Sequence, residues 1–550
     1  MIAVVPARGG SKGIARKNLR LLNGKPLISY VLNTLVKCEL FENIIVTSED
    51  EEILDVATRF PVLIRTRPER LAADDVTLDP VVQDAVDWYE HNYARRIDAV
   101  MTIQPTSPLL SAHTVERGVQ AFVNSRADCL ISVVDATHLM WKETSDGVQP
   151  LFTERLNRQW LPKQFRETGA IVICSRKQLE KGSRIGGNIT IFPVPLWESI
   201  DIDTGIDWLL CSALLNRMTI NFIVSGNQLL GLGHIRRALT LADHWLGHDI
   251  RFICIDTPEH ICDTIRVRNY EITRVSSVNE VSSLIRPGSL VINDILDTSS
   301  DYIEDLLSMP VFVVNFEDLG TGSDLAHLVI NALYERSNPP PNHKYGAQYE
   351  CLDERFSLQP ANSFRKELKT IIVTFGGADP ANLTQKALEA LEPLNNDWEI
   401  RLVLGPAYQW QDELQQFLHN SRIKERLKIF NQVENMARVM KGADLGITSN
   451  GRTVYELAAM GVPMISISQN ERETLHLFAR YSRGVRYLGP SSVTPEEIQN
   501  TVLEIASETN MRRELYDNLP IKELRSGLPR LAKLIESEYK RWRDEKYSNR

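Results

Sequence analysis

Short apolar runs alternate with longer amphipathic stretches along most of the chain. In the first two hundred or so residues, apolar runs predict strands at 2–6, 43–47, 99–104, 129–134 and 170–174. Helical spacing predicts helices at 27–37 and 80–92. Such alternation is typical of βαβ units and predicts an α/β fold with a largely parallel sheet.

The same strand, loop and helix opening begins twice more. An apolar run at 219–224 leads into a glycine-rich turn and a helix-like stretch at 235–245, and a third run at 369–375 ends in Gly376 and Gly377. We therefore expect three units, at 1–217, 218–350 and 351–550. The proline-rich stretch 338–342 predicts a linker between the second and third units, because proline disfavours helices and central strands.

The end of the chain has the pattern of a helix. From residue 529 onward the sequence is charged and helix-prone, and four bulky side chains recur at the spacing of one helical face: Leu531, Ile535, Tyr539 and Trp542. This pattern predicts a closing amphipathic helix.

Composition narrows the class of protein. The chain has 550 residues, more than one core usually supports, and 43% hydrophobic and 24% charged residues, which are ordinary globular values. The net charge of -9 provides no basic field for nucleic acid, so anionic ligands must be met by local cations. Neither a membrane span nor a signal segment is visible, so we expect a cytoplasmic protein. The seven cysteines lack a Cys-x-x-Cys pair, which disfavours zinc and disulfides and indicates buried small side chains.

The stretch from Ala7 to Asn18 directly follows the first predicted strand and contains three glycines and four cations. Glycines allow the backbone to approach a phosphate, and Arg8, Lys12 and Lys17 would offset its charge. The Walker ending Gly-Lys-Ser/Thr is absent. The stretch predicts a nucleotide phosphate loop, and the alternative is a surface turn that binds nothing.

Two further motifs fall at positions where ligands bind in α/β sheets. Gln104 begins Gln-Pro-Thr-Ser-Pro-Leu at the end of a predicted strand, although a plain tight turn is the alternative. Asp201 and Asp203 lie two residues apart on what we expect to be a strand, so their carboxylates would share a face and could hold one Mg²⁺. A solvated acidic turn is the alternative for this pair.

These motifs together resemble the signatures of the CMP-sugar synthetases, the cytidylyltransferases that activate sialic and related 2-keto sugar acids. The resemblance rests on 7–18 with Gly24-Lys25-Pro26-Leu27-Ile28, on 104–109, and on Asp201-Ile202-Asp203-Thr204-Gly205. It implies a Rossmann-like nucleotidyltransferase domain in which the sugar acid attacks the α-phosphorus of CTP, pyrophosphate leaves and Mg²⁺ assists. Synthetases of this type are often dimers, so it also implies a homodimer.

The resemblance assigns roles to individual residues. It implies Arg8, Lys17 and Asp203 as catalytic residues and Asp201 and Asp203 as metal ligands. The substrate contacts that it implies are Ser11, Lys12, Asn18, Gln104, Lys142 and Arg166. The family usually has Asn-Gly-Ala where this chain has Thr168-Gly169-Ala170, and this difference leaves the identity of the sugar acid open.

The second and third units contain another set of candidate residues. His234 follows a glycine turn at a predicted helix start, where the helix dipole favours a neutral imidazole that can act as a general base. The alternative is a capping or surface histidine. At 450–452, backbone amides at a helix start can receive a diphosphate, and Glu456 one turn later can accept from ribose hydroxyls, unless it is an ordinary exposed carboxylate.

These segments resemble the UDP-sugar hydrolase of the pseudaminic acid pathway and its spore-coat relatives, a branch of the two-lobed GT-B architecture. The resemblance rests on 226–237, 317–319, 324–331 and 448–463. It implies that His234 activates water, that UDP leaves, and that no cofactor is needed. The binding residues that it implies are Gly233, Gly376, Gly377, Asn450, Gly451, Glu456 and Asn470. Where that family has Asp-His-Tyr, this chain has Asn293-Asp294-Ile295, so an expected active-site tyrosine is replaced by isoleucine.

The sequence therefore favours a bifunctional enzyme of nonulosonic acid synthesis, with CTP and a 2-keto sugar acid as substrates of one half and a UDP-sugar as substrate of the other. Two alternatives stay open for the C-terminal half: a glycosyltransferase, or an inactive scaffold that binds a nucleotide sugar. The residues leave open which UDP-sugar binds and whether the halves communicate.

Overall fold

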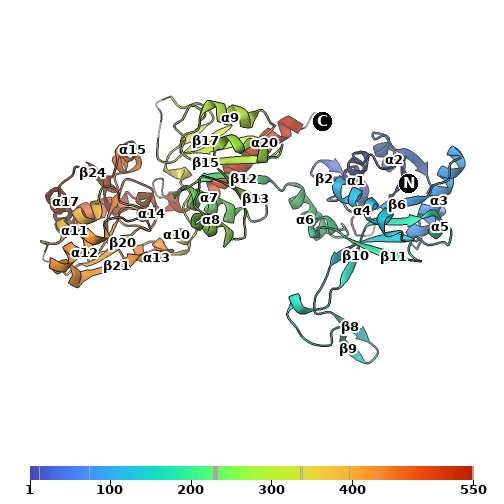
Figure 1. Ribbon diagram of the computed structural model, residues 1–550, viewed down its shortest axis with the longest axis horizontal. Helices are drawn as coiled ribbons and strands as arrows, with labels where there is room; N and C mark the ends of the chain where they lie inside the picture. The colour runs from blue at the N-terminus through green and yellow to red at the C-terminus, as the bar shows by residue number, and fades with distance from the viewer. Residues whose placement is uncertain are drawn as a thin grey trace. The chain divides into compact units, whose positions relative to one another are not determined.

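The computed structural model describes residues 1–10, 13–73, 75–226, 233–334, 336, 338–394, 397–431 and 433–547. Ser11, Lys12 and most of the glycine turn before His234 lie outside these ranges. The chain divides into two compact units, Met1–Arg217 and Met218–Arg550, which Figure 1 shows.

The N-terminal unit is built on a seven-stranded sheet. Its strand order is β11, β7, β10, β6, β1, β4, β5, and β10 alone runs antiparallel to its neighbours β6 and β7. The strands are β1 (Ile2–Pro6), β4 (Ile44–Ser48), β5 (Leu63–Thr66), β6 (Ala99–Ile103), β7 (Cys129–Asp135), β10 (Phe165–Ser175) and β11 (Ile189–Pro193). The helices are α1 (Leu27–Val36), α2 (Glu51–Ala57), α3 (Leu78–Tyr93), α4 (Ala112–Ser125), α5 (Arg176–Leu179) and α6 (Gly205–Leu215). The predicted alternation and the largely parallel sheet are confirmed.

The apolar runs form strands because both faces of this sheet are covered. Along β1, Ala3 and Val5 pack in the cluster that includes α1 and α4, whereas Ile2 and Val4 pack in the cluster that includes α3. Successive side chains of a strand point to opposite faces, so a strand covered on both sides must be apolar throughout. The C-terminal ends of these strands carry the motifs of the first candidate site.

An arm projects from this unit between β7 and β10, as Figure 1 shows. It contains the hairpin of β8 (Trp141–Thr144) and β9 (Gly147–Pro150). Several of its large apolar side chains are exposed, among them Trp141 at 53% and Trp160 at 70%. A second small hairpin pairs β2 (Leu21–Leu22) with β3 (Lys25–Pro26).

The C-terminal unit begins with a lobe of seven parallel strands. Their order is β14, β13, β12, β15, β16, β17, β18. The strands are β12 (Thr219–Ser225), β13 (Asp249–Ile255), β14 (Glu271–Val275), β15 (Leu290–Asp294), β16 (Phe312–Phe316), β17 (Leu328–Asn331) and β18 (His343–Tyr345), and the helices are α7 (Gly233–His244), α8 (Glu259–Arg266) and α9 (Ser300–Leu307).

The predicted linker at the proline run is wrong. Residues 338–342 are followed by β18, which pairs in parallel with β17 and extends the sheet of the N-terminal lobe. Proline disfavours helices and central strands, but a loop within a lobe accommodates it equally well. The crossing to the next lobe comes after Tyr345.

The second lobe has a sheet of six parallel strands in the order β21, β20, β19, β22, β23, β24. The strands are β19 (Thr370–Thr374), β20 (Glu399–Leu404), β21 (Leu427–Asn431), β22 (Leu445–Ser449), β23 (Met464–Ser468) and β24 (Val485–Pro490). The helices are α10 (Arg355–Leu358), α11 (Leu383–Leu391), α12 (Gln411–Asn420), α13 (Met436–Met440), α14 (Thr453–Ala459), α15 (Glu471–Thr474), α16 (Phe478–Tyr481), α17 (Pro495–Ser507), α18 (Thr509–Asp517) and α19 (Ile521–Arg525).

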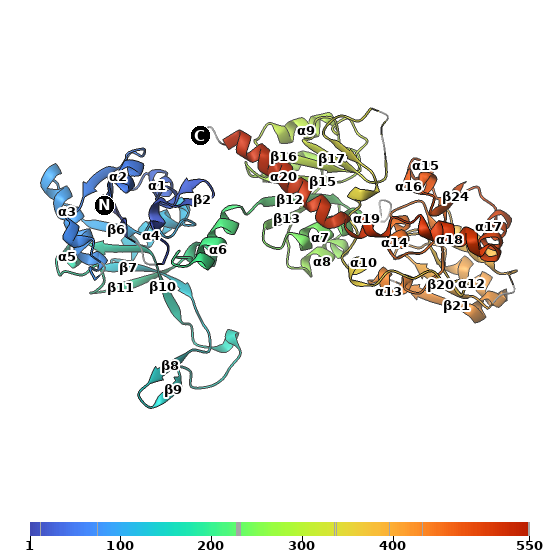
Figure 2. The same ribbon diagram turned by 180° about the vertical axis from the view of Figure 1, so that it is seen from behind.

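The last helix, α20 (Gly527–Tyr547), returns to the first lobe, and Figure 2 shows it running along the side of that sheet. Leu531, Ile535 and Tyr539 are buried in the core of the first lobe, and Trp542 packs against it. The predicted amphipathic helix is confirmed. Two parallel-sheet lobes closed by such a helix make this unit a GT-B-like module.

Two other expectations can be compared with the structure. All seven cysteines are buried free thiols, as predicted. Of the helices that the structure describes, none has the length and apolar character needed to cross a membrane.

Candidate functional sites

The glycine-rich loop of the N-terminal unit passes directly over the segment that carries Asp203. A Cβ atom added to Gly13 would lie 2.2 Å from the carbonyl oxygen of Asp203, although real Cβ contacts essentially never fall below 3.0 Å. Lys17, in the 3₁₀ turn Lys17–Leu19, donates to Asp203 Oδ1 at 2.9 Å and to the carbonyl oxygen of Ile202. Asn18 Nδ2 donates to the carbonyl oxygen of Arg8 at 3.0 Å. The structure thus joins two predicted catalytic residues, Lys17 and Asp203.

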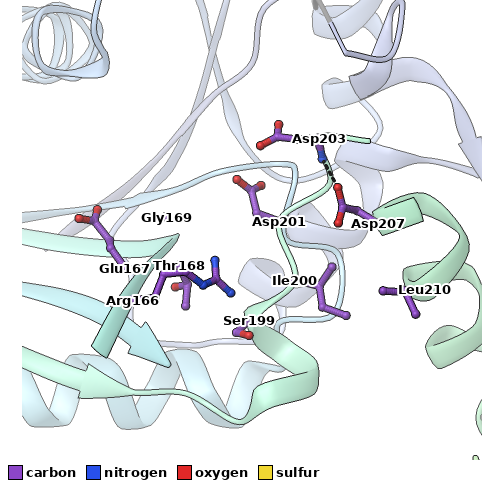
Figure 3. Close-up of a pocket in the computed structure, with 10 residues that line it drawn as sticks. All are labelled: Arg166, Glu167, Thr168, Gly169, Ser199, Ile200, Asp201, Asp203, Asp207 and Leu210. Carbon is purple, nitrogen blue, oxygen red and sulfur yellow. Dashed lines mark hydrogen bonds between the residues drawn. The ribbon is translucent and has the colours of Figure 1, made fainter. Parts of the chain in front are cut away.

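A cavity of about 450 Å³ opens beside Asp203. Its walls come from a bulge in β10, between Glu167 and Val172, and from the segment that leads into α6. β-Bulges commonly occur next to active sites, and this volume lies in the range of ligand pockets. Figure 3 shows the residues that line it: Arg166, Glu167, Thr168, Gly169, Ser199, Ile200, Asp201, Asp203, Asp207 and Leu210.

Asp201 and Asp203 both line this cavity, but the strand predicted for them is wrong. They lie in an irregular segment between the 3₁₀ turn Leu196–Ser199 and α6. Ile202 between them is fully buried, while Asp203 is exposed. The two carboxylates reach one cavity because buried Ile202 points the other way, without any sheet pairing.

The two carboxylates fit a divalent cation. Asp201 Oδ1 is buried and has no hydrogen-bond partner in the described part of the chain. Burial, with the neighbouring charge of Asp203, raises the pKa of Asp201. A bound cation would offset both the cost of burying the Asp201 carboxylate and its repulsion by Asp203. Mg²⁺ typically takes one or two carboxylates together with waters and substrate phosphates. Within the described residues no cluster of three or more His, Cys, Asp or Glu could hold a metal, so substrate oxygens would complete the shell.

Asp207 has a structural role beside the metal candidates. Its carboxylate accepts from the backbone N–H of Asp203 at 3.2 Å, drawn as a dashed line in Figure 3, and from Thr204 N–H at 2.7 Å. This capping box begins α6 and fixes the backbone that carries Asp203.

Gln104 and Thr168 shape the wall opposite the carboxylates. Gln104 Nε2 donates to the carbonyl oxygen of Gly169 at 3.0 Å, so Gln104 contacts the wall of the cavity. The Thr168 hydroxyl lies 2.6 Å from Ser132 Oγ and donates to the carbonyl oxygen of Ser132, so its hydrogen bonds are made within the sheet. At the position where the resembled family usually has asparagine, the Thr168 hydroxyl is therefore hydrogen-bonded to Ser132. Lys142 lies on the arm, in β8, away from the residues that line the cavity.

The second candidate site lies in the C-terminal unit, where His234 is the second residue of α7. His234 Nδ1 lies 2.5 Å from Oδ1 of Asp294, at the end of β15. An ionised carboxylate can only accept a hydrogen bond, so Nδ1 carries the proton and Nε2 is the basic nitrogen. This arrangement orients an imidazole for general-base chemistry.

Arg237, one turn further along α7, fixes Asp294. Its Nε and one terminal nitrogen donate to the two Asp294 oxygens at 2.6 and 2.5 Å, and its other terminal nitrogen donates to Glu317 at 3.2 Å. Both Arg237 and Asp294 are almost fully buried. Burial alone would raise the pKa of Asp294, but Arg237 and His234 outweigh it and hold that pKa well below its usual range. Asp294 therefore stays ionised beside His234.

Glu317 links this network to the wall of the cavity. Its carboxylate accepts from the backbone N–H groups of Ala332 at 3.1 Å and Leu333 at 3.3 Å. Its backbone is left-handed, with φ of 51°, a conformation that costs about 1 to 3 kcal/mol outside glycine and is often found at functional sites.

A cavity of about 190 Å³ lies between the two lobes of this unit. Its N-terminal-lobe lining is Gly233, His234, Arg237, Leu296, Glu317, Leu333 and Tyr334, and its C-terminal-lobe lining is Arg452, Asn470, Arg472, Glu473 and His476. Arg472, from the C-terminal lobe, donates to two residues of the N-terminal lobe, to Asp297 at 3.1 Å and to the Tyr334 hydroxyl at 2.8 Å.

The expected tyrosine position does not line this cavity. Ile295 packs against the core of the N-terminal lobe, and the neighbouring Leu296 lines the cavity instead, with a left-handed φ of 71°. Tyr334 supplies a phenol from another loop. The isoleucine therefore does not by itself leave the site without a tyrosine.

Several predicted binding residues of the second lobe lie in or beside the cavity lining. Asn470 lines it and also caps α15 by accepting from Glu473 N–H at 2.9 Å. Asn450 is fully buried and donates to the carbonyl oxygens of Glu473 and His476 at 2.8 and 3.2 Å, so it shapes the segment that lines the site. A Cβ on Gly451 would lie 3.3 Å from Glu473 Oε1. Burial raises the pKa of Glu473 to about 7.

Three other predicted residues lie outside this lining. Glu456 is half-buried on α14, and Gly376 and Gly377 form the turn after β19. Gly376 has a φ of 77°, which favours glycine.

Sequence reasoning missed the partners of the predicted residues. Arg237 and Asp294 lie in segments that the sequence singled out, but a single sequence does not show that their side chains meet. Glu49 and Arg67, which form an ion pair at the glycine-rich loop, lie outside every predicted motif.

The two sites define a nucleotidyltransferase-type domain followed by a two-lobed GT-B-like module. Residues 2–178 match the model described as cytidylyltransferase, and residues 370–528 match the glycosyltransferase family 28 C-terminal domain. The CMP-N,N'-diacetyllegionaminic acid synthase of Legionella pneumophila is 30% identical over 224 residues, 39% of this chain and 96% of the relative. Through this N-terminal unit the chain belongs to the cytidylyltransferase family.

Two further likenesses have different coverage. The N-acylneuraminate cytidylyltransferase A of Danio rerio is 30% identical over 213 residues, 38% of this chain and 48% of the relative. The solved structure of Acinetobacter baumannii MurG aligns with 58% of this chain and 99% of its own, at 15% identity and a TM-score of 0.41. The chain spans about half the length of the first curated relatives it matches, between 48% and 56%.

Proposed function

We propose that the N-terminal unit transfers CMP from CTP to a 2-keto sugar acid and releases pyrophosphate. The observation that carries the proposal is the meeting of three groups at Asp203: the glycine-rich loop, the carboxylate pair and the cavity that Arg166 lines. The similarity to synthases of N-acylneuraminate and diacetyllegionaminic acid conjugates supports a sugar acid as acceptor.

The residues divide the reaction between them. Glycine-loop amides, Arg8 and Lys17 would hold the triphosphate, and Arg166 would pair with the carboxylate of the sugar acid. Asp201 and Asp203 would hold Mg²⁺, which when bound neutralises charge on the phosphates. No side-chain nucleophile is needed, because the anomeric hydroxyl attacks the α-phosphorus and the bond to pyrophosphate breaks. Positioning of the substrates and neutralisation of their charge would provide the rate enhancement.

Pyrophosphate release from CTP, with a panel of 2-keto sugar acids and Mg²⁺, tests this function. We expect release with at least one acid, and loss by about a hundredfold or more in Asp203→Asn. Asp55→Asn, at an exposed position of α2, is the matched control. Full release by Asp203→Asn at limiting Mg²⁺ would contradict the role of the carboxylate.

We propose that the C-terminal unit transfers a sugar from a nucleotide sugar, in keeping with its match to glycosyltransferase family 28. The observation that carries this proposal is that His234, which lines the cavity between the lobes, is paired with buried Asp294 behind it. His234 Nε2 would take the proton of the acceptor as its oxygen attacks the anomeric carbon, and the nucleoside diphosphate would leave. The hydrolase expected from the sequence is the case in which water is the acceptor, and the family match does not favour it over transfer.

Release of UDP from a panel of UDP-sugars by the full chain separates these cases. Transfer predicts release that depends on an added acceptor alcohol, whereas hydrolysis predicts the same rate without one. His234→Ala should reduce either rate by about 10²- to 10⁴-fold. An unchanged rate in His234→Ala, with UDP still bound, would support the inactive-scaffold alternative.

The exposed apolar side chains of the arm support self-association, because monomers rarely expose large apolar surfaces. We propose a homodimer of the N-terminal unit on this basis. Sedimentation of the full chain, alone and with Trp160→Glu, tests it.

A further inference from the structure

An ion pair lies behind the glycine-rich loop and has no part in the proposed chemistry. Glu49 follows β4 and Arg67 follows β5, at the C-terminal ends of two neighbouring parallel strands. Arg67 Nε and a terminal nitrogen donate to Glu49 Oε2 at 2.9 and 2.5 Å. The Arg67 side chain is only 3% exposed, and that of Glu49 is 21% exposed. Such a pair is costly to bury unless its remaining hydrogen-bonding groups are satisfied.

The pair uses those remaining groups to hold the loop backbone. Glu49 Oε1 accepts from the N–H of Gly9 at 2.8 Å, and Arg67 donates to the carbonyl oxygen of Ala7 at 3.2 Å. The pair thus holds the loop backbone at two points, the N–H of Gly9 and the carbonyl oxygen of Ala7.

The charge of the pair argues for a positioning role. A lone carboxylate beside a phosphate-binding loop would repel the ligand, but Arg67 neutralises Glu49. Burial alone would raise the pKa of Glu49, yet the hydrogen bonds from Arg67 and from Gly9 N–H outweigh it and keep that pKa below its usual value. The carboxylate therefore stays ionised and holds the amide of Gly9 firmly.

We propose that Glu49 and Arg67 are positioning residues that fix the glycine-rich loop in the shape that receives the triphosphate of CTP. The inference rests on the proposed CMP transfer. A loop that is already ordered avoids the entropy of ordering on binding, so the pair acts on nucleotide affinity more than on the chemical step. Neither residue touches the reacting atoms.

The test uses Glu49→Met, Arg67→Met and the double variant in the full chain, with Glu51→Met, at an exposed position of α2, as the matched control. Each single variant leaves a charge without its partner, so its melting temperature should fall, whereas the double variant should regain most of that loss. In all three, KM for CTP should rise about tenfold or more, while kcat changes by less than about threefold. Amide exchange at residues 7–10 should quicken in all three.

Each contrary result has a clear meaning. If the double variant recovers KM along with stability, the pair is structural only and the inference is wrong. If Glu49→Met keeps the original KM while Arg67→Met does not, Arg67 acts on the nucleotide by itself, which also overturns it. A wild-type chain that forms no pyrophosphate refutes the proposed function, but amide exchange at residues 7–10 would still show whether the pair holds the loop.

Discussion

The replacement Gly13→Ala tests the contact between the glycine-rich loop and the metal-site segment. A Cβ at this position would lie 2.2 Å from the Asp203 carbonyl oxygen, against a floor of about 3.0 Å for real contacts. Loop and segment must therefore separate by roughly 1 Å, and a misplacement of that size can cost about 10²-fold in rate. The contact is with backbone, so no side-chain rotation can relieve it. We expect kcat/KM for CTP to fall by about a hundredfold.

Pyrophosphate release under varied CTP, at saturating sugar acid and Mg²⁺, measures this effect. Gly205→Ala is the matched control, because a Cβ there meets nothing within 4 Å and the position is near Asp203 in sequence. Circular dichroism should show that both variants are folded. If Gly13→Ala keeps kcat/KM within about threefold of the wild type, the loop does not need its close approach to Asp203, and the reasoning is refuted.

Three further predictions concern the C-terminal unit. Asp294→Asn should lower kcat/KM for the nucleotide sugar by about 10² or more, because an amide, which can also donate, replaces the ionised carboxylate that fixes the His234 tautomer. Exposed Asp301→Asn is the control, and wild-type activity from pH 6 to 9 in Asp294→Asn would contradict this. Folding raises the pKa of Glu473 to about 7, so the folded state holds this proton more tightly than the unfolded state does. Thermal stability should therefore fall as pH rises from about 4 to 7, and Glu473→Gln should flatten that slope. An unchanged slope in Glu473→Gln would argue against a protonated Glu473. A Cβ on Gly527 would lie 2.3 Å from the Glu350 carbonyl oxygen, where two chain segments pass between the lobes. Gly527→Ala should therefore cost about 1 to 3 kcal/mol of stability in denaturant unfolding, whereas Gly247→Ala should not.

The elements were predictable where the hydrophobic pattern is strong. The expected strand at 2–6 is β1. The expected apolar face of the last helix, with Leu531, Ile535 and Tyr539, is the face of α20 that is buried in the core of the first lobe. Buried parallel strands and amphipathic helices are specified by local patterns, so one sequence suffices for them. The linker predicted at the proline run was wrong because proline favours loops both within a lobe and between lobes, and here the loop leads into β18 of the same sheet.

The candidate sites were predictable in their motifs but not in their partners. Asp201 and Asp203 share a cavity as expected, although no strand holds them there. Contacts such as those of Glu49 with Arg67 and of His234 with Asp294 join residues separated by 18 and 60 positions. Such pairs depend on strand order in the sheet, which local patterns do not specify.

Reciprocal inactivation in the full chain tests whether one chain carries two separate active sites. Pyrophosphate release from CTP and UDP release from a UDP-sugar would be measured side by side for the wild type, Asp203→Asn and His234→Ala. We expect Asp203→Asn to lose pyrophosphate release and keep UDP release, and His234→Ala to show the opposite. Loss of both activities in either variant, or turnover of neither substrate by the wild type, would contradict the account.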